Sequence, residues 1–400
     1  MSWEKVKLED LCISITDGDH QSLPLAENGI PFIVIADINS NNRIDFSNAR
    51  YVPLDYYEKL DKKRKPQKGD VLLTVKGSFG IPVYVADDSP FVFQRDIAIL
   101  KCNKRINPRF LYYYMKNREF YLYTDSIAIG AAQRAITLKA LKNTIIRLPP
   151  LDTQAGIVNL LSAYDDLIEN NQKQIKLLEE AAQRLYKEWF VDLRFPGHEN
   201  TPIVDGVPEG WVTGQFSDYT DIMSGGTPKT DVAEFYRGNI PFYTPKDSDG
   251  SFFAFDTLTH ISESGLEHCN SKFYPTGTVI ITARGTVGKT TILAVPMAMN
   301  QSCYALKSDT LNSPYYLFFS LNLEVEKLKT MANGGVFNTI IVKTFDQISL
   351  TIPQKEVLQA FDQRVTPIME QIKAKMGQIS LLKEARVRLL PKLMNGEIEV

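Results

Sequence analysis

Residues 157–189 read IVNLLSAYDDLIENNQKQIKLLEEAAQRLYKEW. Apolar or near-apolar residues recur there at steps of four and three, which is a heptad pattern with a period of about 3.5. Only Asn171 interrupts the series with a polar group. At roughly 1.5 Å per residue the helix would run about 50 Å, longer than a small globular domain is wide. The heptad positions are Ile157, Leu161, Tyr164, Ile168, Asn171, Ile175, Leu178, Ala182, Leu185 and Trp189.

The same pattern returns at the end of the chain. Adding 204 to each position gives a second series from Phe361 to Leu393, in which eight of the ten residues are apolar. The two series also share letters, because residues 177–181 read LLEEA and residues 381–385 read LLKEA. One such helix alone is typical of a core or bundle helix. Two at a fixed offset indicate a repeat, and we expect their apolar seams to meet, with a kink at Pro367.

Length and composition predict a folded protein of two to three domains, since the 400 residues have ordinary hydrophobic (44%) and charged (23%) fractions. The N-terminus carries no apolar signal segment, and no run of about eighteen apolar residues occurs. The histidines and cysteines lie far apart, without zinc or disulfide spacing. We therefore expect a cytoplasmic protein without metal, cofactor or membrane contact. The cysteines are Cys12, Cys102, Cys269 and Cys303, and the histidines are His20, His198, His260 and His268.

Charge is distributed unevenly, although the net charge is only −2. Residues 1–150 hold 22 basic and 17 acidic residues, a net of +5, so the remainder has a net of −7. The basic surplus is concentrated between Arg95 and Arg147. A basic face on the first half is the sharper interpretation, and a solvated surface is the plainer one. The run KKRK at 62–65 is likewise either a solvated loop or a phosphate contact.

The globular parts between the long helices also repeat. The residues Gly-Asn-Ile-Pro-Phe at 238–242 match Asn-Gly-Ile-Pro-Phe at 28–32, and an aromatic helix is expected in each half. The order of segments is therefore domain, helix, domain, helix, with a Pro-rich and Gly-rich linker in the middle. The further matching segments are 69–80 with 277–288, 94–96 with 300–302, 110–114 with 315–319, and 130–149 with 334–353.

One segment loosely fits a phosphate-binding loop. Residues 283–290 read ARGTVGKT and follow a predicted strand. A phosphate loop must open a helix, whose N-terminal amides hold the phosphates. The next residues, TILAVP at 291–296, are β-branched and end in proline, so a strand–turn–strand loop is the better interpretation.

A second segment, Asn107-Pro108-Arg109-Phe110, resembles the Asn-Pro-Pro-Phe signature of amino-methylating methyltransferases. Its third residue differs, and helix capping by Asn107 with Pro108 in the first turn already explains it. No glycine-rich loop for S-adenosylmethionine accompanies it. We find no convincing catalytic set, and a divergent DNA adenine methyltransferase is the alternative function.

The chain as a whole resembles the DNA-specificity subunits of type I restriction–modification systems. The match spans essentially the whole length and includes the order of the repeats. The residues that carry it are EWFVDLRFPG at 188–197, PEGW at 208–211, SGGTP at 224–228 and IPFYTPKD at 240–247.

The resemblance implies an α+β protein with an internal twofold repeat. Two α/β target recognition domains would be separated by two long helices that pair as an antiparallel coiled coil. The implied segments are a first recognition domain at 1–150, a first spacer helix at 151–195, a linker at 196–210, a second recognition domain at 211–353 and a second spacer helix at 354–400.

The resemblance further implies a non-catalytic subunit that reads a bipartite site on double-stranded DNA. Two modification (methyltransferase) subunits would dock on the helices, and restriction (endonuclease) subunits would join that core. Apolar residues off the heptad line, among them Leu177 and Phe190, predict this docking surface. We expect Phe190→Asp to impair assembly while leaving the chain folded.

Base edges are read by Arg, Lys, Gln, Asn, Ser and Thr from loops that enter the major groove. Glycine beside a basic residue lets the backbone approach a phosphate. For each single residue a structural turn is the open alternative. The expected DNA-contacting residues are Lys76, Gly77, Ser78, Gln94, Arg95, Gln133 and Arg134 in the first domain, and Arg284, Gly285, Thr286, Asn300, Gln301, Ser302 and Asn338 in the second.

Overall fold

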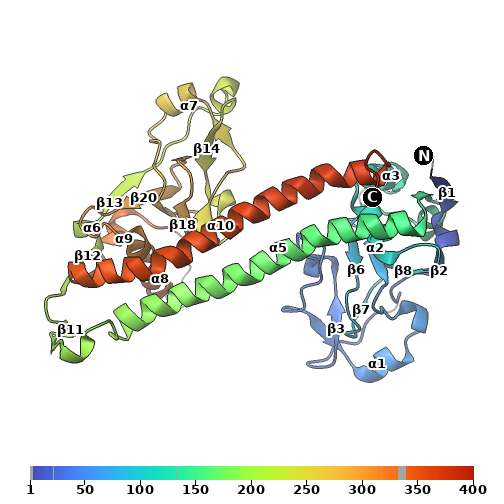
Figure 1. Cartoon of the computed structure of the whole chain (residues 1–400), viewed down its shortest axis with the longest axis horizontal. Coiled ribbons are helices and arrows are strands. Elements are labelled where there is room, and N and C mark those ends of the chain that lie inside the picture. The colour runs from blue at the N-terminus through green and yellow to red at the C-terminus, as the bar shows by residue number, and fades with distance from the viewer. Residues whose placement is uncertain (1–2, 21, 132, 332–338) are drawn as a thin grey trace. The chain divides into compact units, whose positions relative to one another are not determined.

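The computed structural model describes residues 3–20, 22–131, 133–331 and 339–400. The chain divides into two compact units. Unit 1 comprises Met1–Ile168 with Leu381–Val400, and unit 2 comprises Glu169–Ser380. Two long helices, α5 (Leu151–Tyr186) and α10 (Lys355–Met394), each run without interruption and contribute to both units (Figure 1). α10 continues through Pro367 as a single helix.

The described residues of unit 1 form three small sheets and a group of short helices. A four-stranded antiparallel sheet has the order β2-β8-β5-β6, a three-stranded sheet has the order β4-β3-β7, and β1 pairs with β9. The strands are β1 (Glu4–Lys7), β2 (Cys12–Asp17), β3 (Ile30–Ile33), β4 (Arg50–Val52), β5 (Val71–Thr74), β6 (Pro82–Tyr84), β7 (Val92–Phe93), β8 (Ile97–Cys102) and β9 (Ile145–Leu148). The helices are α1 (Leu54–Lys59), α2 (Pro108–Lys116), α3 (Arg118–Ile127) and α4 (Leu138–Lys142).

The central strands of this sheet read as continuous apolar runs because both of their faces are covered. Val71 and Leu73 of β5 pack into the cluster that includes α2 and α5, whereas Leu72 packs on the opposite side with Ile33 and Phe93. Side chains alternate between the two faces of a strand, so one short apolar strand joins two cores.

Helix α2 begins where capping residues predict. The Asn107 side chain accepts a hydrogen bond of 2.9 Å from the Arg109 amide, and Pro108 occupies the first turn. Phe110 and Leu111 are fully buried. Asn107 therefore caps the helix, as the capping pattern predicts.

Two cysteines that are distant in sequence meet in this sheet. Cys12 and Cys102 are cross-strand partners in the β2–β8 ladder, and both are free thiols. Their spacing of ninety residues gave no hint of this pairing, because only the register of the two strands brings them together.

Unit 2 contains corresponding strand pairings. A sheet with the order β13-β20-β17-β18-β15, a sheet with the order β16-β14-β19, the pair β12–β21 and the hairpin β10–β11 form its β structure. The strands are β10 (Ile203–Val204), β11 (Val207–Pro208), β12 (Val212–Gln215), β13 (Asp221–Ser224), β14 (Ile240–Tyr243), β15 (Phe253–Ala254), β16 (His260–Ile261), β17 (Val279–Thr282), β18 (Thr290–Leu293), β19 (Ala298–Met299), β20 (Cys303–Lys307) and β21 (Ser349–Ile352). The helices are α6 (Phe216–Tyr219), α7 (Glu263–Glu267), α8 (Pro314–Met331) and α9 (Val342–Phe345).

The segment that loosely fits a phosphate-binding loop joins two strands of this sheet. β17 ends at Thr282, the turn follows, and β18 begins at Thr290. The predicted strand–turn–strand structure is confirmed, and no helix N-terminus is available there to hold phosphates.

The long helices contact each other within each unit. In unit 1 the Arg386 guanidinium forms an ion pair with Asp165, whose other carboxylate oxygen accepts a hydrogen bond of 2.7 Å from the Tyr113 hydroxyl. In unit 2 the Asn171 amide donates to Gln378 Oε1 at 3.3 Å. Asn171, the polar heptad residue, is thus buried and paired, as a polar group inside an apolar seam must be.

Helix α5 ends in a π-helical turn, Lys187–Val191, that inserts aromatic side chains into unit 2. Trp189 is buried under the Arg364 guanidinium, which lies 5.0 Å from its ring centroid. The Phe190 ring lies 4.7 Å from Tyr316 and 5.0 Å from Phe361, both in edge-to-face geometry. A widened turn re-aims side chains relative to a regular helix, which a strict heptad count does not anticipate.

These contacts argue against Phe190 as a free docking residue, and the effect of Phe190→Asp on assembly stays a prediction. This side chain is half-buried and packs against the aromatic core of unit 2. Tyr186, also off the heptad line, is buried. The exposed large apolar residues on α5 are instead Leu151 (53%), Leu167 (51%) and Leu177 (65%).

Phe190→Ala should lower the free energy of unfolding by about 3 kcal/mol, because truncation leaves a cavity among aromatic rings. The exposed Leu177→Ala is the matched control on the same helix and should change it by less than about 0.5 kcal/mol. Urea denaturation of the full chain measures both. Equal losses in the two variants would contradict the placement of Phe190 in the core.

Candidate nucleic-acid interface

Three of the predicted loops of unit 1 meet at the end of β5. The Val75 amide donates to the Asp96 carbonyl at 2.8 Å, and the Val75 carbonyl accepts from the Ile136 amide at 2.8 Å. The Gly77 amide donates to the Arg134 carbonyl at 3.3 Å. Main-chain hydrogen bonds therefore bring together the turns that contain Lys76, Gln94 and Gln133, although these residues are far apart in sequence.

The side chains on these turns are polar and largely exposed. Gly77, Ser78, Arg95 and Gln133 are exposed, and Gln94 is half-buried. The Lys76 ammonium lies 4.0 Å from the Asp96 carboxylate. Lys76 and Arg95 line a cavity of about 300 Å³ together with Asp17 and residues 135–138.

Arg134 is the most constrained cation of this group. Its guanidinium lies 2.5 Å from the Asp125 carboxylate and also donates to the Asp125 carbonyl. It stacks over the Phe79 ring at 5.6 Å from the ring centroid. Arg134 therefore braces the β5–β6 turn, and its own charge is partly neutralised.

Unit 2 repeats this arrangement with other side chains. The Ala283 amide donates to the Ser302 carbonyl at 2.7 Å, and the Ala283 carbonyl accepts from the Ile340 amide at 2.9 Å. These bonds occupy the same place relative to β17 as those of Val75 do relative to β5. The loop that carries Arg284 is thus joined to the loop that carries Gln301.

The candidate residues of unit 2 again face outward. Arg284, Gly285, Thr286 and Gln301 are exposed, and Asn300 and Ser302 are half-buried. The hydroxyl of Thr286 donates to the Pro245 carbonyl at 3.2 Å, and the Asn300 side chain accepts from the Ser302 amide at 3.0 Å. The Thr227 hydroxyl donates to Gln301 Oε1. Asn338 lies outside the described residues.

A glycine permits a close backbone approach next to each of these loop groups. A Cβ at Gly18 would lie 2.2 Å from the Phe93 carbonyl oxygen, and one at Gly225 would lie 2.2 Å from the Asn300 carbonyl oxygen. Neither glycine has a left-handed backbone, so lack of space is what excludes a side chain. The backbone just after β2 and β13 is therefore in direct contact with the backbone of the turns that contain Gln94 and Asn300.

Sequence reasoning missed a polar cluster beside the unit 1 loops. The Asp19 carboxylate accepts from the Tyr56 hydroxyl at 2.7 Å and from the Arg64 guanidinium at 3.2 Å. His20 Nε2 lies 2.9 Å from Asp17. Burial, and next the Asp19 carboxylate, raise the pKa of Tyr56. The segment Thr16-Asp17-Gly18-Asp19-His20 gave only a turn signal, since its partners are contributed by residues near 56–64.

Among the described residues, no group of three or more His, Cys, Asp or Glu side chains could hold a metal ion. No helix in the described part of the chain is long and apolar enough to cross a membrane.

Comparison with known proteins identifies similar chains. A family model described as type I restriction modification DNA specificity domain matches residues 1–180 and 208–379. The HindI type I restriction enzyme specificity subunit of Haemophilus influenzae is 24% identical over 99% of each chain. The MjaIX type I restriction enzyme specificity subunit of Methanocaldococcus jannaschii is 26% identical over 100% of this chain and 94% of its own. The type I restriction–modification S subunit of M. genitalium shares the fold, with a TM-score of 0.61 at 17% identity, over 98% of this chain and 96% of its own.

Gly225→Ala should lower the free energy of unfolding by about 1–3 kcal/mol, because the added methyl group has no room beside the Asn300 carbonyl. Gly377→Ala, inside α10, is the matched control, since its Cβ would meet only Phe255 at 3.9 Å. That control should stabilise the chain by up to about 1 kcal/mol. Thermal unfolding compares the two, and a neutral Gly225→Ala would refute the close approach.

Proposed function

The chain belongs to the type I restriction–modification DNA specificity family, and we propose that its two units each read one half of a bipartite target on double-stranded DNA. The observation that carries this proposal is the recurrence of one loop group in both units. In each, a strand end at Val75 or Ala283 is followed by a turn with a basic residue, Lys76 or Arg284, and is hydrogen-bonded to two further loops. The subunit itself is non-catalytic, and methylation or cleavage belongs to partner subunits.

The residues proposed to contact DNA differ in whether their side chains are exposed or already held by other residues of the chain. Arg95 and Arg284 are exposed and suit base or phosphate contacts, since guanidinium groups donate in a fork that fits guanine or phosphate oxygens. Gln94, Asn300 and Gln301 carry amides that suit adenine. Arg134 is braced by Asp125, so we assign it chiefly to holding the turn.

Two glycines of the proposed interface determine the conformation of its turns. Gly77 and Gly285 have positive φ angles of 71° and 78°, a conformation that glycine adopts without strain. Tight turns of this kind let the main chain approach the phosphate backbone of DNA. Lys76, Ser78, Thr286, Gln133, Ser302 and Asn338 complete the proposed set.

We infer that the two long helices pair as an antiparallel coiled coil that sets the distance between the half-sites. Two contacts between the helices support an antiparallel pairing, because a later residue of α5 meets an earlier residue of α10. Asp165 pairs with Arg386 within unit 1, whereas the later Asn171 pairs with the earlier Gln378 within unit 2. The correspondence of strand orders supports an internal twofold repeat, with recognition domains at 1–150 and 211–353, helices at 151–195 and 354–400, and a linker at 196–210.

The partners that we propose are two modification (methyltransferase) subunits and, on that core, restriction subunits. Apolar side chains that gather on the helices and face water support a protein-docking role, because contiguous apolar patches rimmed by polar residues mark binding surfaces. In unit 2, Leu177 and Ala181 of α5 with Ile368 of α10 line a groove of about 520 Å³ that is rimmed by charged residues. In unit 1, Leu381 and Val387 of α10 are exposed.

Arg284→Ala should weaken binding to the second half-site by about 1–3 kcal/mol if Arg284 contacts a base, with no loss on duplexes in which that half-site is already altered. Fluorescence anisotropy of the assembled methyltransferase on the methylated motif and on half-site variants measures this. Lys307→Ala is the matched control, because Lys307 lies at the opposite end of β20 from Ser302. Unchanged affinity of Arg284→Ala on all duplexes would contradict the loop assignment.

A further inference from the structure

A basic segment of unit 1 lies outside the predicted reading loops. Residues 61–68 read DKKRKPQK and thus carry five cations and one carboxylate. The segment contains a short 3₁₀ turn, Lys62–Arg64, whose first residue is preceded by Asp61. The Asp61 side chain accepts a hydrogen bond of 2.8 Å from the Lys63 amide, so it serves as the cap of the turn.

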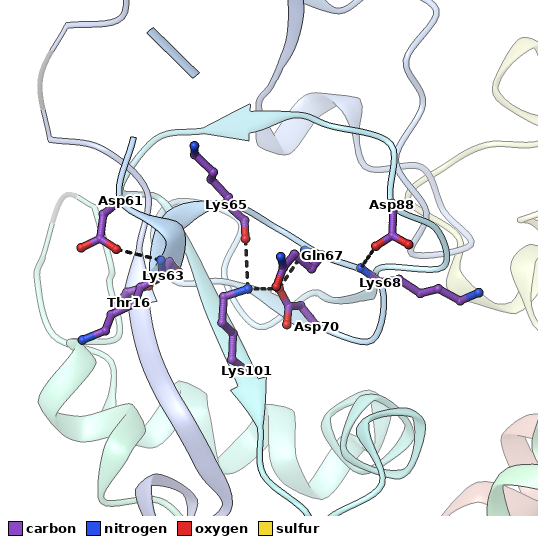
Figure 2. Close-up of polar contacts among 9 residues, drawn as sticks. All are labelled: Thr16, Asp61, Lys63, Lys65, Gln67, Lys68, Asp70, Asp88 and Lys101. Atoms are coloured by element: carbon purple, nitrogen blue, oxygen red, sulfur yellow. Dashed lines mark hydrogen bonds and ion pairs between the residues drawn. The ribbon is translucent and has the colours of Figure 1, made fainter. Parts of the chain in front are cut away.

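A buried ion pair holds this segment against the sheet. The Lys101 ammonium on β8 lies 2.5 Å from the Asp70 carboxylate, and the two side chains are only 14% and 10% exposed. The same ammonium donates to the Lys65 carbonyl at 3.0 Å, and Asp70 also accepts from the Gln67 amide at 2.8 Å (Figure 2). Removing one member of a buried pair is costly, so the segment has a defined position and is not a loose loop.

The cations of the segment divide into two groups. Arg64 is paired with Asp19, and the Lys65 ammonium donates to the Glu58 carbonyl and lies 4.7 Å from the centroid of the Tyr57 ring. Lys62 and Lys63 are exposed, and their ammonium groups make no ion pair or hydrogen bond with any described residue. Lys68 is exposed too, and Figure 2 shows the Lys63 and Lys68 side chains extending away from the buried pair.

Lys68 lies beside two carboxylates, Asp87 and Asp88, whereas Lys62 and Lys63 share one, Asp61, whose side chain is engaged in capping their turn. The Lys68 amide donates to the Asp88 carboxylate at 3.0 Å. Hydrogen bonds from Ser89, and to a lesser extent the charge of Lys68, lower the pKa of Asp87. Lys62 and Lys63 are therefore the two cations of the segment that are most available to an external anion.

The segment is continuous with the proposed reading loops. The Thr16 hydroxyl on β2 donates to the Lys63 carbonyl at 3.0 Å. Arg64 contacts Asp19, and the backbone of Asp19 forms a β-bridge with Gln94, a proposed DNA-contacting residue. The segment with Lys62 and Lys63 is thus connected, through β2 and the residues that follow it, to the surface that is proposed to face the first half-site.

At the equivalent position in unit 2, before Gly277, the sequence has no comparable basic run. Gly69 and Gly277 are equivalent positions, because the Gly69 amide donates to Val85 at 2.9 Å and the Gly277 amide donates to Leu293 at 2.8 Å, each just before the central strand. The seven residues before Gly277, NSKFYPT, contain one lysine, whereas those before Gly69, KKRKPQK, contain five cations.

Building on the proposed function, we propose that Lys62 and Lys63 bind DNA phosphates beside the first half-site and that the second unit lacks this clamp. Phosphate oxygens are the complementary ligand for adjacent free ammonium groups on a surface that already faces duplex DNA. The contact carries no sequence information. It strengthens binding to all duplexes alike and makes the hold on DNA asymmetric between the two half-sites.

The test compares Lys62→Ala/Lys63→Ala with the wild-type chain by anisotropy on a labelled duplex, in the assembled methyltransferase, over a series of NaCl concentrations. Each lost phosphate contact reduces the slope of log affinity against log salt by about 0.9. The double variant should therefore reduce that slope by nearly two. Between about 50 and 200 mM salt, the wild type should lose roughly tenfold more affinity than the variant.

Lys5→Ala/Lys104→Ala is the matched control, because it removes the same charge from unit 1 at exposed positions. Lys104 follows β8 at the end opposite to the turn that contains Arg95. The control should keep the wild-type slope, and thermal unfolding should show both variants folded.

Two readouts separate this proposal from the function on which it rests. Preference for the target duplex over a scrambled one tests the function, and the salt slope tests the clamp. A retained preference with an unchanged slope in the Lys62→Ala/Lys63→Ala variant overturns the clamp alone. A folded Lys62→Ala/Lys63→Ala variant that no longer assembles with the methyltransferase subunits also overturns the clamp and assigns the lysines to a protein partner. If the wild-type protein does not prefer the target duplex and the Lys62→Ala/Lys63→Ala variant still has a reduced slope, the clamp is supported and half-site reading is rejected.

Discussion

Neither unit can complete its hydrophobic core without both long helices, and the rest of the structure depends on this constraint. In unit 1 the core includes Ile157 and Leu161 from α5 together with Leu393 from the end of α10. In unit 2 it includes Trp189 and the residues of α10 around Phe361. Burial of large apolar side chains is the main favourable term in folding. Each helix is therefore fixed at both ends in a core.

A second constraint is that main-chain hydrogen bonds, and not side chains, hold the proposed reading loops together. The bonds of Val75 and of Ala283 are equivalent, although the residues on the turns differ, with Lys76 and Ser78 in one unit and Arg284 and Thr286 in the other. A frame of this kind tolerates exchange of the exposed side chains, because surface substitutions away from caps and cores change stability little. It suits two readers with the same architecture and different targets.

The large-scale order of the molecule could be predicted because periodicity and repetition are properties of the sequence itself. The heptad series located α5 and α10, and the helix-capping residues Asn107 and Pro108 located the start of α2. The loops of the candidate site were also identifiable, since glycine beside a basic residue after an apolar strand marks an exposed turn. Their joining at Val75 became apparent only from the sheet.

What could not be predicted depends on contacts between residues that are distant in sequence. Phe190 lies off the heptad line, and in the π-helical turn it packs against the aromatic core of unit 2. The basic run at 62–65 gave no sign of whether it was loose or fixed, because its anchor is the pairing of Asp70 with Lys101 across the sheet. Spacing in the sequence also could not reveal that Cys12 faces Cys102.

The claim that the helices space two readers is tested most directly by inserting one heptad into both α5 and α10 and mapping the methylated motif. Seven residues preserve the apolar seam and lengthen each helix by about 10 Å. On duplex DNA this distance is about three base pairs at roughly 3.4 Å each. Our account predicts the same two half-sites with a longer spacer, or loss of methylation where the added rotation of the groove is not accommodated. Full methylation at the original spacing would contradict it.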